Sequence, residues 1–192
     1  MISPKEKLIA ERARYETYSV WGDATHWTQR GAFIGYQLLM ETIDAKNGGR
    51  YRILQEEDYD ITVTDQGETL FGGIHRENNS EDFRLRAPAA AEARDRLGPY
   101  ADDQTNDYFV NESAGNDTCV LFVCDSYFRA FLMDDIAQSF HDTVFINGTP
   151  YLDELPALVE QFHPDIVVVE NAERADRSHR IAKAAQAFLA EE

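Results

Sequence analysis

The sequence is short of basic residues, and this shortage excludes several classes of partner. Its 192 residues include 18 lysines and arginines against 35 aspartates and glutamates, so the formal net charge is −17 at pH 7. Nucleic acids and anionic membrane surfaces are bound through basic faces. We therefore expect no nucleic-acid partner, and a strongly anionic polymer would need basic residues gathered at its binding site.

Long apolar runs are missing as well. The longest is Cys119–Cys124, far below the roughly 20 residues of a membrane-spanning helix. The first residues, Met1–Lys7, are not followed by the apolar segment of a signal peptide. The sequence predicts a cytoplasmic protein, or an extracytoplasmic one if the chain is a fragment of an exported protein.

Cysteine is scarce, and this argues against a disulfide framework. Cys119 and Cys124 lie on one apparent strand, where a spacing of five points their side chains to opposite faces. We expect both to be buried apolar residues. The histidines show no metal-binding spacing such as His-Glu-x-x-His, so we expect neither a metal nor another cofactor.

The C-terminal part of the chain alternates strand and helix patterns. Continuous apolar runs predict strands that are covered on both faces, at Cys119–Cys124, Thr143–Ile146 and Ile166–Val169. Helical patterns follow these runs, at Phe128–Phe140, at Leu152–Phe162 and after a capping Ser178. This alternation predicts a three-layer α/β/α fold with a parallel sheet.

The N-terminal part predicts one clear helix and then a polar insertion. Thr28 is placed to cap a helix whose apolar residues run from Phe33 to Ile43, and Asn47-Gly48-Gly49 is a stop signal. Residues 51–117 show short alternating stretches between turn signals, which predict a β-hairpin followed by a long loop or short helix. We expect a single domain, residues 1–192, that contains this insertion.

Polar residues follow each predicted strand, where ligands bind in open α/β sheets. Asp125-Ser126 follows the first strand, at the start of a helix whose dipole and N–H groups favour a developing oxyanion. Asn147-Gly148 and Glu170-Asn171 follow the other two and offer a backbone N–H and an amide donor. Taken singly, each of these features is also typical of an ordinary helix cap or turn. A ligand-binding role and a purely structural role therefore both stay open.

A second candidate group lies upstream, immediately before the first helix. Asp23 and His26 are three residues apart there. A serine nucleophile needs an imidazole to accept its proton and a carboxylate to orient that imidazole. The hypothesis is therefore Ser126 as nucleophile, His26 as base and Asp23 as acid, while a histidine beside Trp27 is also typical of a purely structural role.

Together these residues resemble the SGNH (GDSL-type) hydrolase superfamily, in the permuted order of its AlgX/AlgJ-like (DHHW) polysaccharide O-acetyltransferase branch. The resemblance rests on Asp23, on His26-Trp27-Thr28 with Gly31-Ala32, and on Asp125-Ser126-Tyr127, and it runs from about Tyr15 to the C-terminus. It implies an SGNH/flavodoxin-like fold. It also implies an oxyanion hole made by the Ser126 N–H, Gly148 and Asn171.

The resemblance further implies a serine-dependent carbohydrate O-acetylesterase or O-acetyltransferase that works through an acetyl-serine intermediate. The expected partner is an acetylated carbohydrate or polysaccharide, with a larger cell-envelope assembly as a further option. Candidate substrate-binding residues are Trp27, Tyr127, Arg129 and Arg174. The acceptor, water or a sugar hydroxyl, is left open by the sequence.

Two departures from the family pattern support an alternative to the enzyme hypothesis. The branch has its aspartate two residues before the histidine, whereas Asp23 stands three before His26, and Cys124 stands where a glycine is usual. These differences favour a catalytically inactive SGNH-like carbohydrate-binding or assembly subunit. A flavodoxin-like or receiver-like module is a third hypothesis, although the chain has no glycine-rich phosphate loop.

Overall fold

The computed structural model describes residues 2–18, 26–65, 68–69, 75–76, 79–172, 180–183 and 186. These residues form two compact units, Met1–Pro88 and Ala89–Glu192. The stretch 51–117, predicted as one insertion, is therefore shared between the two units. The assignment of the whole chain to a single domain stays a prediction.

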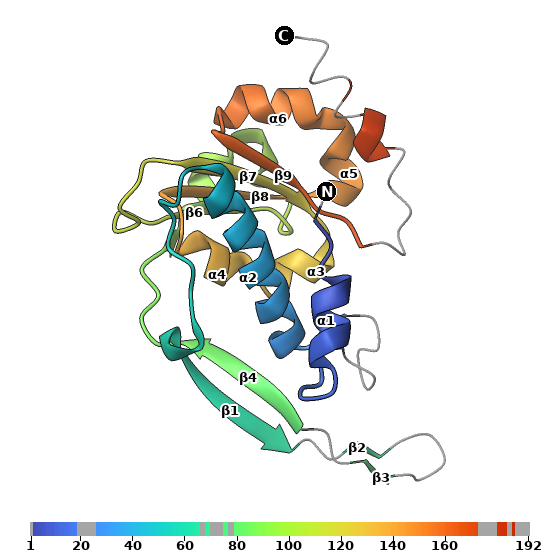
Figure 1. The fold of residues 1–192 in the computed structure, drawn as a ribbon. Coiled ribbons are helices and arrows are strands. Elements are labelled where there is room, and N and C mark those ends of the chain that lie inside the picture. The colour runs from blue at the N-terminus through green and yellow to red at the C-terminus, as the bar shows by residue number, and fades with distance from the viewer. Residues whose placement is uncertain are drawn as a thin grey trace. The chain divides into compact units, whose positions relative to one another are not determined.

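The first unit contains two helices and a β-hairpin (Figure 1). Its elements are α1 (Lys5–Glu11), α2 (Gln29–Lys46), the 3₁₀ helix η1 (Glu56–Asp58), β1 (Tyr59–Asp65), β2 (Glu68–Thr69), β3 (His75–Arg76) and β4 (Asn79–Leu85). Strands β1 and β4 are antiparallel, and their register sets Tyr59 opposite Leu85. The predicted hairpin is thus confirmed.

Helix α2 begins and ends where the sequence predicts. The Thr28 side chain caps it by accepting a hydrogen bond from the Gly31 N–H at 3.0 Å. At the other end, Asn47 is the C-cap and Gly48 has φ 86°, a left-handed conformation that favours glycine. Between these ends α2 buries an apolar face made of Phe33, Ile34, Tyr36, Leu39, Met40 and Ile43.

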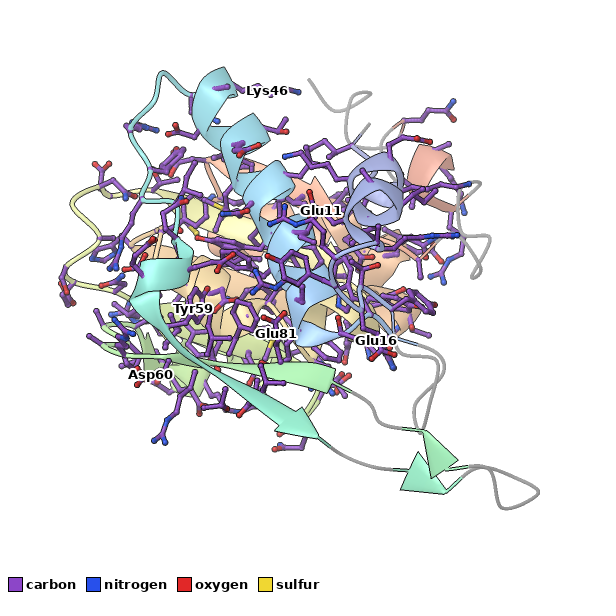
Figure 2. The ribbon with its side chains drawn as sticks, turned by 60° about the horizontal axis from the view of Figure 1, so that its bottom comes forward. Glu11, Glu16, Lys46, Tyr59, Asp60 and Glu81 are labelled. Atoms are coloured by element: carbon purple, nitrogen blue, oxygen red, sulfur yellow. The ribbon has the colours of Figure 1, made fainter. Side chains whose placement is uncertain are left out.

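The hairpin is attached to α2 by a buried charged cluster around Arg30. The Arg30 guanidinium donates to the Glu81 carboxylate of β4 at 2.6 and 2.7 Å and to Glu56 at 2.5 Å. It lies between the rings of Tyr15 and Phe83, with centroids 4.3 and 4.7 Å away. Burial by itself lowers the pKa of Arg30, but the two carboxylates outweigh it and raise the pKa overall. Figure 2 shows Glu81 in this region.

The second unit is built on a five-stranded mixed sheet of order β5-β6-β8-β7-β9. Its strands are β5 (Ala91–Glu92), β6 (Asp107–Val110), β7 (Cys119–Cys124), β8 (Asp142–Asn147) and β9 (Ile166–Val169). Strands β7, β8 and β9 are parallel, while β6 pairs with β8 and β5 with β6 in the antiparallel sense. The predicted α/β fold is confirmed, but the sheet is mixed because part of the predicted insertion extends it.

Short helices cover both faces of this sheet. They are η2 (Arg94–Tyr100), α3 (Ser126–Arg129), α4 (Met133–Ala137), α5 (Gly148–Tyr151), η3 (Leu152–Glu154) and α6 (Leu155–Phe162). Figure 1 shows α5 and α6 on one face and α3 and α4 on the other. The two helices predicted here are each broken into shorter ones, and Pro156 in the first turn of α6 suits a new helix start. Residues 180–183 are helical as predicted, whereas the capping Ser178 lies outside the described residues.

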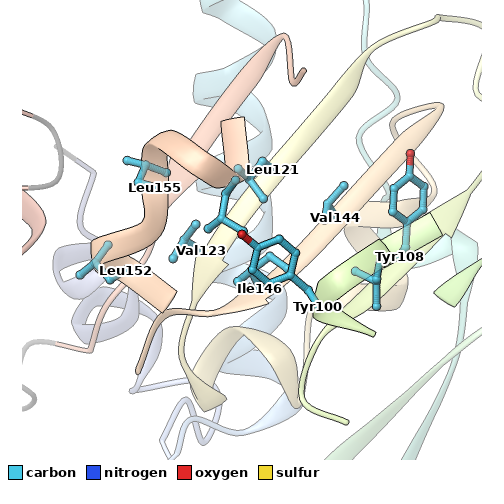
Figure 3. Close-up of a cluster of buried hydrophobic side chains, with 10 residues drawn as sticks. Tyr100, Tyr108, Leu121, Val123, Val144, Ile146, Leu152 and Leu155 are labelled. Atoms are coloured by element: carbon cyan, nitrogen blue, oxygen red, sulfur yellow. The ribbon is translucent and has the colours of Figure 1, made fainter. Parts of the chain in front are cut away.

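The core of the second unit lies on the two faces of the central strands. Leu121, Val123 and Ile146 face α6 and are fully buried in an apolar cluster (Figure 3). On the opposite face the Phe122 ring stacks on Phe128 of α3 and on Phe145 of β8, at 5.4 and 5.2 Å between centroids. Burial of successive residues on both faces explains why β7 reads as a continuous apolar run.

No helix within the described ranges is long and apolar enough to cross a membrane.

Candidate active site

The carboxyl ends of β7, β8 and β9 lie at one edge of the sheet of the second unit. In the parallel register Cys124 is opposite Asn147, and Val123 is opposite Val169. The residues that follow these strand ends therefore emerge at the same edge. They include three of the predicted site residues, which are Ser126, Gly148 and Asn171.

Ser126 is the first residue of α3, and its side chain is exposed. The helix is capped by the preceding residue, because the Asp125 carboxylate accepts a hydrogen bond from the Tyr127 N–H at 2.9 Å. Capping would have been the ordinary explanation for a serine at this point. Asp125 has that role here, so capping of α3 does not account for Ser126.

Gly148 is the first residue of α5, and its surroundings are held by polar side chains. Asn147 caps this helix by accepting from the Thr149 N–H at 3.0 Å. Asn147 is held in turn by its N–H to Asn106 Oδ1 and by its Nδ2 to Thr105 Oγ1, both at 2.9 Å. A Cβ atom on Gly148 would meet its nearest neighbours at an ordinary 3.5 Å. Packing alone therefore does not require glycine at this position.

Asn171 supplies the third group at this edge. Its side-chain Nδ2 donates to the backbone carbonyl of Ala172 at 2.9 Å. A carboxamide nitrogen carries two hydrogens, so this bond uses only one of them. The buried Oδ1 atom of Asn171 has no hydrogen-bond partner among the described residues.

The turns after β7 and β9 are tied together by two carboxylates. Asp125 Oδ2 accepts from the Ala172 N–H at 2.9 Å, and the Asp125 N–H donates to Glu170 Oε2 at 3.1 Å. The Glu170 N–H itself donates to the Val123 carbonyl at 2.9 Å. These bonds connect the residue before Ser126 to both neighbours of Asn171.

His26, the predicted base, belongs to the first unit, where it is half-buried immediately before the Trp27 bridge. Trp27 pairs with Tyr18, and the Thr28 hydroxyl donates to the Glu16 carbonyl at 2.5 Å. These contacts hold the segment that carries His26 against the chain before it. Asp23, the predicted acid, lies outside the described residues, and the pairing of His26 with Ser126 stays a prediction.

The predicted substrate-binding residues differ in their surroundings. Trp27 is only 8% exposed, and a Cβ on Gly35 would lie 2.7 Å from its ring. The indole thus packs against α2 and is buried there. Tyr127 and Arg129 are half-buried on α3, while Arg174 lies outside the described residues.

Several polar residues near the site were not found from the sequence. Thr105 and Asn106 reach Asn147 from the stretch predicted as an insertion, and no motif marks them. Hydrogen bonds from the Thr105 hydroxyl and N–H hold the pKa of Asp103 in the same loop below its usual range. Glu170 belongs to the polar group after the third predicted strand, but the sequence assigned no role to its side chain.

Cys124 is buried as the sequence predicts, whereas Cys119 is half-buried. Burial raises the pKa of Cys119 to about 12 and raises that of Cys124 as well. Cys124 is 1% exposed. Thiolates are the reactive form, so Ser126 rather than a thiol is the candidate nucleophile at this edge. The residues with described positions contain no group of three or more potential metal ligands.

Comparison with known proteins shows which solved structures have a similar fold. No family model and no curated protein matches the chain. Solved structures do match: Bacillus cereus PatB1 has a TM-score of 0.58 at 18% identity over 85% of this chain. PatB1 with a sulfonyl adduct has a TM-score of 0.56 at 21% identity over 76%. A DHHW family protein from Eubacterium siraeum has a TM-score of 0.59 at 11% identity over 88%.

These matches extend over most of this chain, and they confirm the predicted likeness at the level of the fold. The chain is similar to PatB1 and to the DHHW family protein in its α/β architecture. It spans 57% to 67% of the length of those chains.

Proposed function

We propose that the chain is a serine-dependent carbohydrate O-acetylesterase or O-acetyltransferase. The observation that carries this proposal is the edge of the sheet where Ser126 is exposed at a helix start while Asp125 caps that helix. Gly148 and Asn171 follow the two neighbouring strands at the same edge. The structure of PatB1 with a sulfonyl adduct adds support, since sulfonylation is a reaction of activated nucleophiles.

The proposed reaction has two steps. His26, oriented by Asp23, accepts the Ser126 hydroxyl proton while Oγ attacks the acetyl carbonyl. The oxyanion is stabilised by the N–H groups of Ser126 and Gly148 and by the Asn171 amide. The C–O bond to the donor then breaks, and the departing oxygen takes the proton from His26. Water or a sugar hydroxyl next gives its proton to His26 and attacks the acetyl carbonyl. The bond to Ser126 Oγ breaks, Oγ takes the proton from His26, and acetate or the acetylated sugar is released.

The substrate assignment follows from the resemblance and the site. Tyr127 and Arg129 lie on the helix that Ser126 begins, so they and Arg174 are the proposed substrate-binding residues. Trp27 is left out because its ring is buried. The proposed partner is an acetylated carbohydrate or polysaccharide, within a larger cell-envelope assembly as the family resemblance implies.

One observation favours a second candidate, a non-catalytic carbohydrate-binding or assembly subunit. The Asn171 amide already donates to the carbonyl of Ala172, which commits one of its two hydrogens within its own turn. Together with the altered position of Asp23, this suits a fold that binds sugars without activating a serine.

The replacement Ser126→Ala tests the first candidate. It should reduce turnover of an aryl acetate by about 10⁴-fold or more, because the nucleophile and its intermediate are lost. Ser113→Ala, at another exposed serine, is the matched control and should keep wild-type turnover. Peptide mapping after treatment with a fluorophosphonate should place the label on Ser126.

Other outcomes decide against this candidate. If the wild type and Ser126→Ala turn over the aryl acetate equally, the serine mechanism is wrong. If the wild type binds an oligosaccharide but neither hydrolyses the ester nor takes the fluorophosphonate label, the non-catalytic candidate replaces it.

A further inference from the structure

The carboxylate of Asp125 is bonded on two sides, once within its own turn and once to the turn after β9. One oxygen accepts from the Tyr127 N–H at the start of α3, and the other accepts from the Ala172 N–H, both at 2.9 Å. The residue is only 9% exposed. Charge-assisted bonds of this kind are shorter and stronger than neutral ones, so the side chain has a single well-held orientation.

Glu170 completes the link in the opposite direction. Its carboxylate accepts from the Asp125 N–H at 3.1 Å, while Asp125 accepts from the N–H of Ala172. Glu170 and Ala172 are the two chain neighbours of Asn171. The position of Asn171 is thus fixed from both sides by a residue that directly precedes Ser126.

We infer that Asp125 is a positioning residue that sets the distance between Ser126 and the Asn171 amide. This inference rests on the proposed function. Oxyanion stabilisation depends on donors that are already in place when charge develops, and an error of about 1 Å can cost about 100-fold in rate. Asp125 reaches both turns with one side chain, so its loss would let Asn171 move relative to the nucleophile.

The far end of the same two strands offers a matched control. Asp165 Oδ2 accepts from the Cys119 N–H at 2.9 Å, and the Asp165 N–H donates to the Cys119 carbonyl. This aspartate therefore joins β7 and β9 as Asp125 does, but at the amino ends of the strands. It has the same type of bond without the proximity to Ser126.

The experiment compares Asp125→Asn with Asp165→Asn in the full chain, with an aryl acetate as substrate. An asparagine retains one acceptor oxygen, so one of the two N–H groups at Asp125 then faces an NH₂ group. We expect kcat to fall about 10- to 100-fold in Asp125→Asn, with KM changed less than about 3-fold. Fluorophosphonate labelling of Ser126 should slow in parallel. Asp165 is exposed and its carboxylate accepts one bond, so Asp165→Asn should lose no more thermal stability than Asp125→Asn and keep kcat within about 2-fold.

A second pair of variants keeps the test decisive if Asp125→Asn fails to fold. Glu170→Ala removes the oxygen that accepts from the Asp125 N–H, whereas Glu170→Gln retains an acceptor oxygen of the same reach. We expect kcat to fall in Glu170→Ala and to be regained in part by Glu170→Gln. Equal kcat values in these two variants would contradict the inference.

The outcomes separate the inference from the function on which it rests. Wild-type protein that neither hydrolyses the ester nor labels at Ser126 would overturn both. Wild-type activity with equal kcat in Asp125→Asn and Asp165→Asn would overturn the positioning role alone and leave the proposed function standing.

Discussion

The two units of the chain differ in the interactions at their centres. The centre of the second unit is apolar: the side chains of Leu121, Phe122 and Val123 have no exposed surface. In the first unit the guanidinium of Arg30 is 5% exposed and joins α2 to Glu81 and Glu56 between two aromatic rings. Apolar burial has no preferred direction, whereas the charged cluster depends on each partner.

This difference bears on function. An apolar sheet that is buried on both faces provides a rigid platform for groups at the strand ends, and functional groups on such platforms are positioned more precisely than groups on loops. Ser126, Gly148 and Asn171 all lie at such ends. The segment that carries His26 instead precedes α2, whose first turn contains Arg30. Stability in that region depends on these polar contacts as well as on the buried apolar face of α2.

The largest effect is expected from Phe122→Ala in the second unit. The ring is fully buried and stacks on Phe128 and Phe145, so its removal leaves a cavity. We expect a loss of about 3–5 kcal/mol in the free energy of unfolding, measured by urea denaturation. Ile9→Ala, at a side chain 48% exposed, is the control and should change it by less than about 0.5 kcal/mol. Equal losses in the two variants would contradict an apolar core at β7.

An intermediate effect is expected from Arg30→Ala in the first unit. It leaves the Glu81 carboxylate, which is 16% exposed, without its partner, while Glu56 is 51% exposed and solvated. We therefore expect a loss of about 2–3 kcal/mol, below the full cost of breaking a buried ion pair. Hydrogen exchange should increase in α2 and in the β1–β4 hairpin. Arg30→Lys keeps the charge but not the planar fork, so it should recover only part of the loss.

Arg86→Ala is the control for this charged cluster. Arg86 pairs with Asp60 in the same unit, with the two side chains 57% and 65% exposed, so its removal should cost under about 1 kcal/mol. If Arg30→Ala cost no more than this, the first unit would not depend on its buried charge.

The smallest effect concerns His141 at the edge of the second unit. Its Nδ1 lies 2.6 Å from Asp142 Oδ2, and this hydrogen bond, with Glu112 nearby, raises the pKa of the imidazole above its usual value. The resulting stabilisation is fully present below the unfolded pKa of about 6.5 and is lost as the pH rises through the folded pKa. We expect under about 1 kcal/mol. The stability difference between wild type and His141→Gln should shrink from pH 5.5 to 8.5, and a constant difference would contradict the ion pair.

Much of the fold could be predicted because its signals are local. The Thr28 cap, the glycines after α2 and the apolar runs of β7 and β9 are each contained in a few consecutive residues. Strand β6 was missed because its residues, Asp107–Val110, form a strand by pairing with distant residues, among them β8 more than 30 residues later in the chain.

In the candidate site, too, residues with a local sequence signal could be predicted, and contacts between distant residues could not. Ser126, Gly148 and Asn171 could be selected because each follows a predicted strand. Trp27 was assigned to substrate binding from its residue type, and its burial against Gly35 could not be read from the pattern. The bond from Ala172 to Asp125 joins residues 47 apart, so it too was invisible to local reasoning.

The sequence by itself determined which residues of the second unit emerge at the carboxyl edge of the sheet. Strand periodicity and the parallel βαβ connection leave little choice in that placement. Only the tertiary structure decided that Asp125, rather than Ser126, caps α3 and that the same carboxylate reaches the turn after β9. The physical reason is that a hydrogen bond depends on distance and direction between atoms that the chain brings together only when it folds.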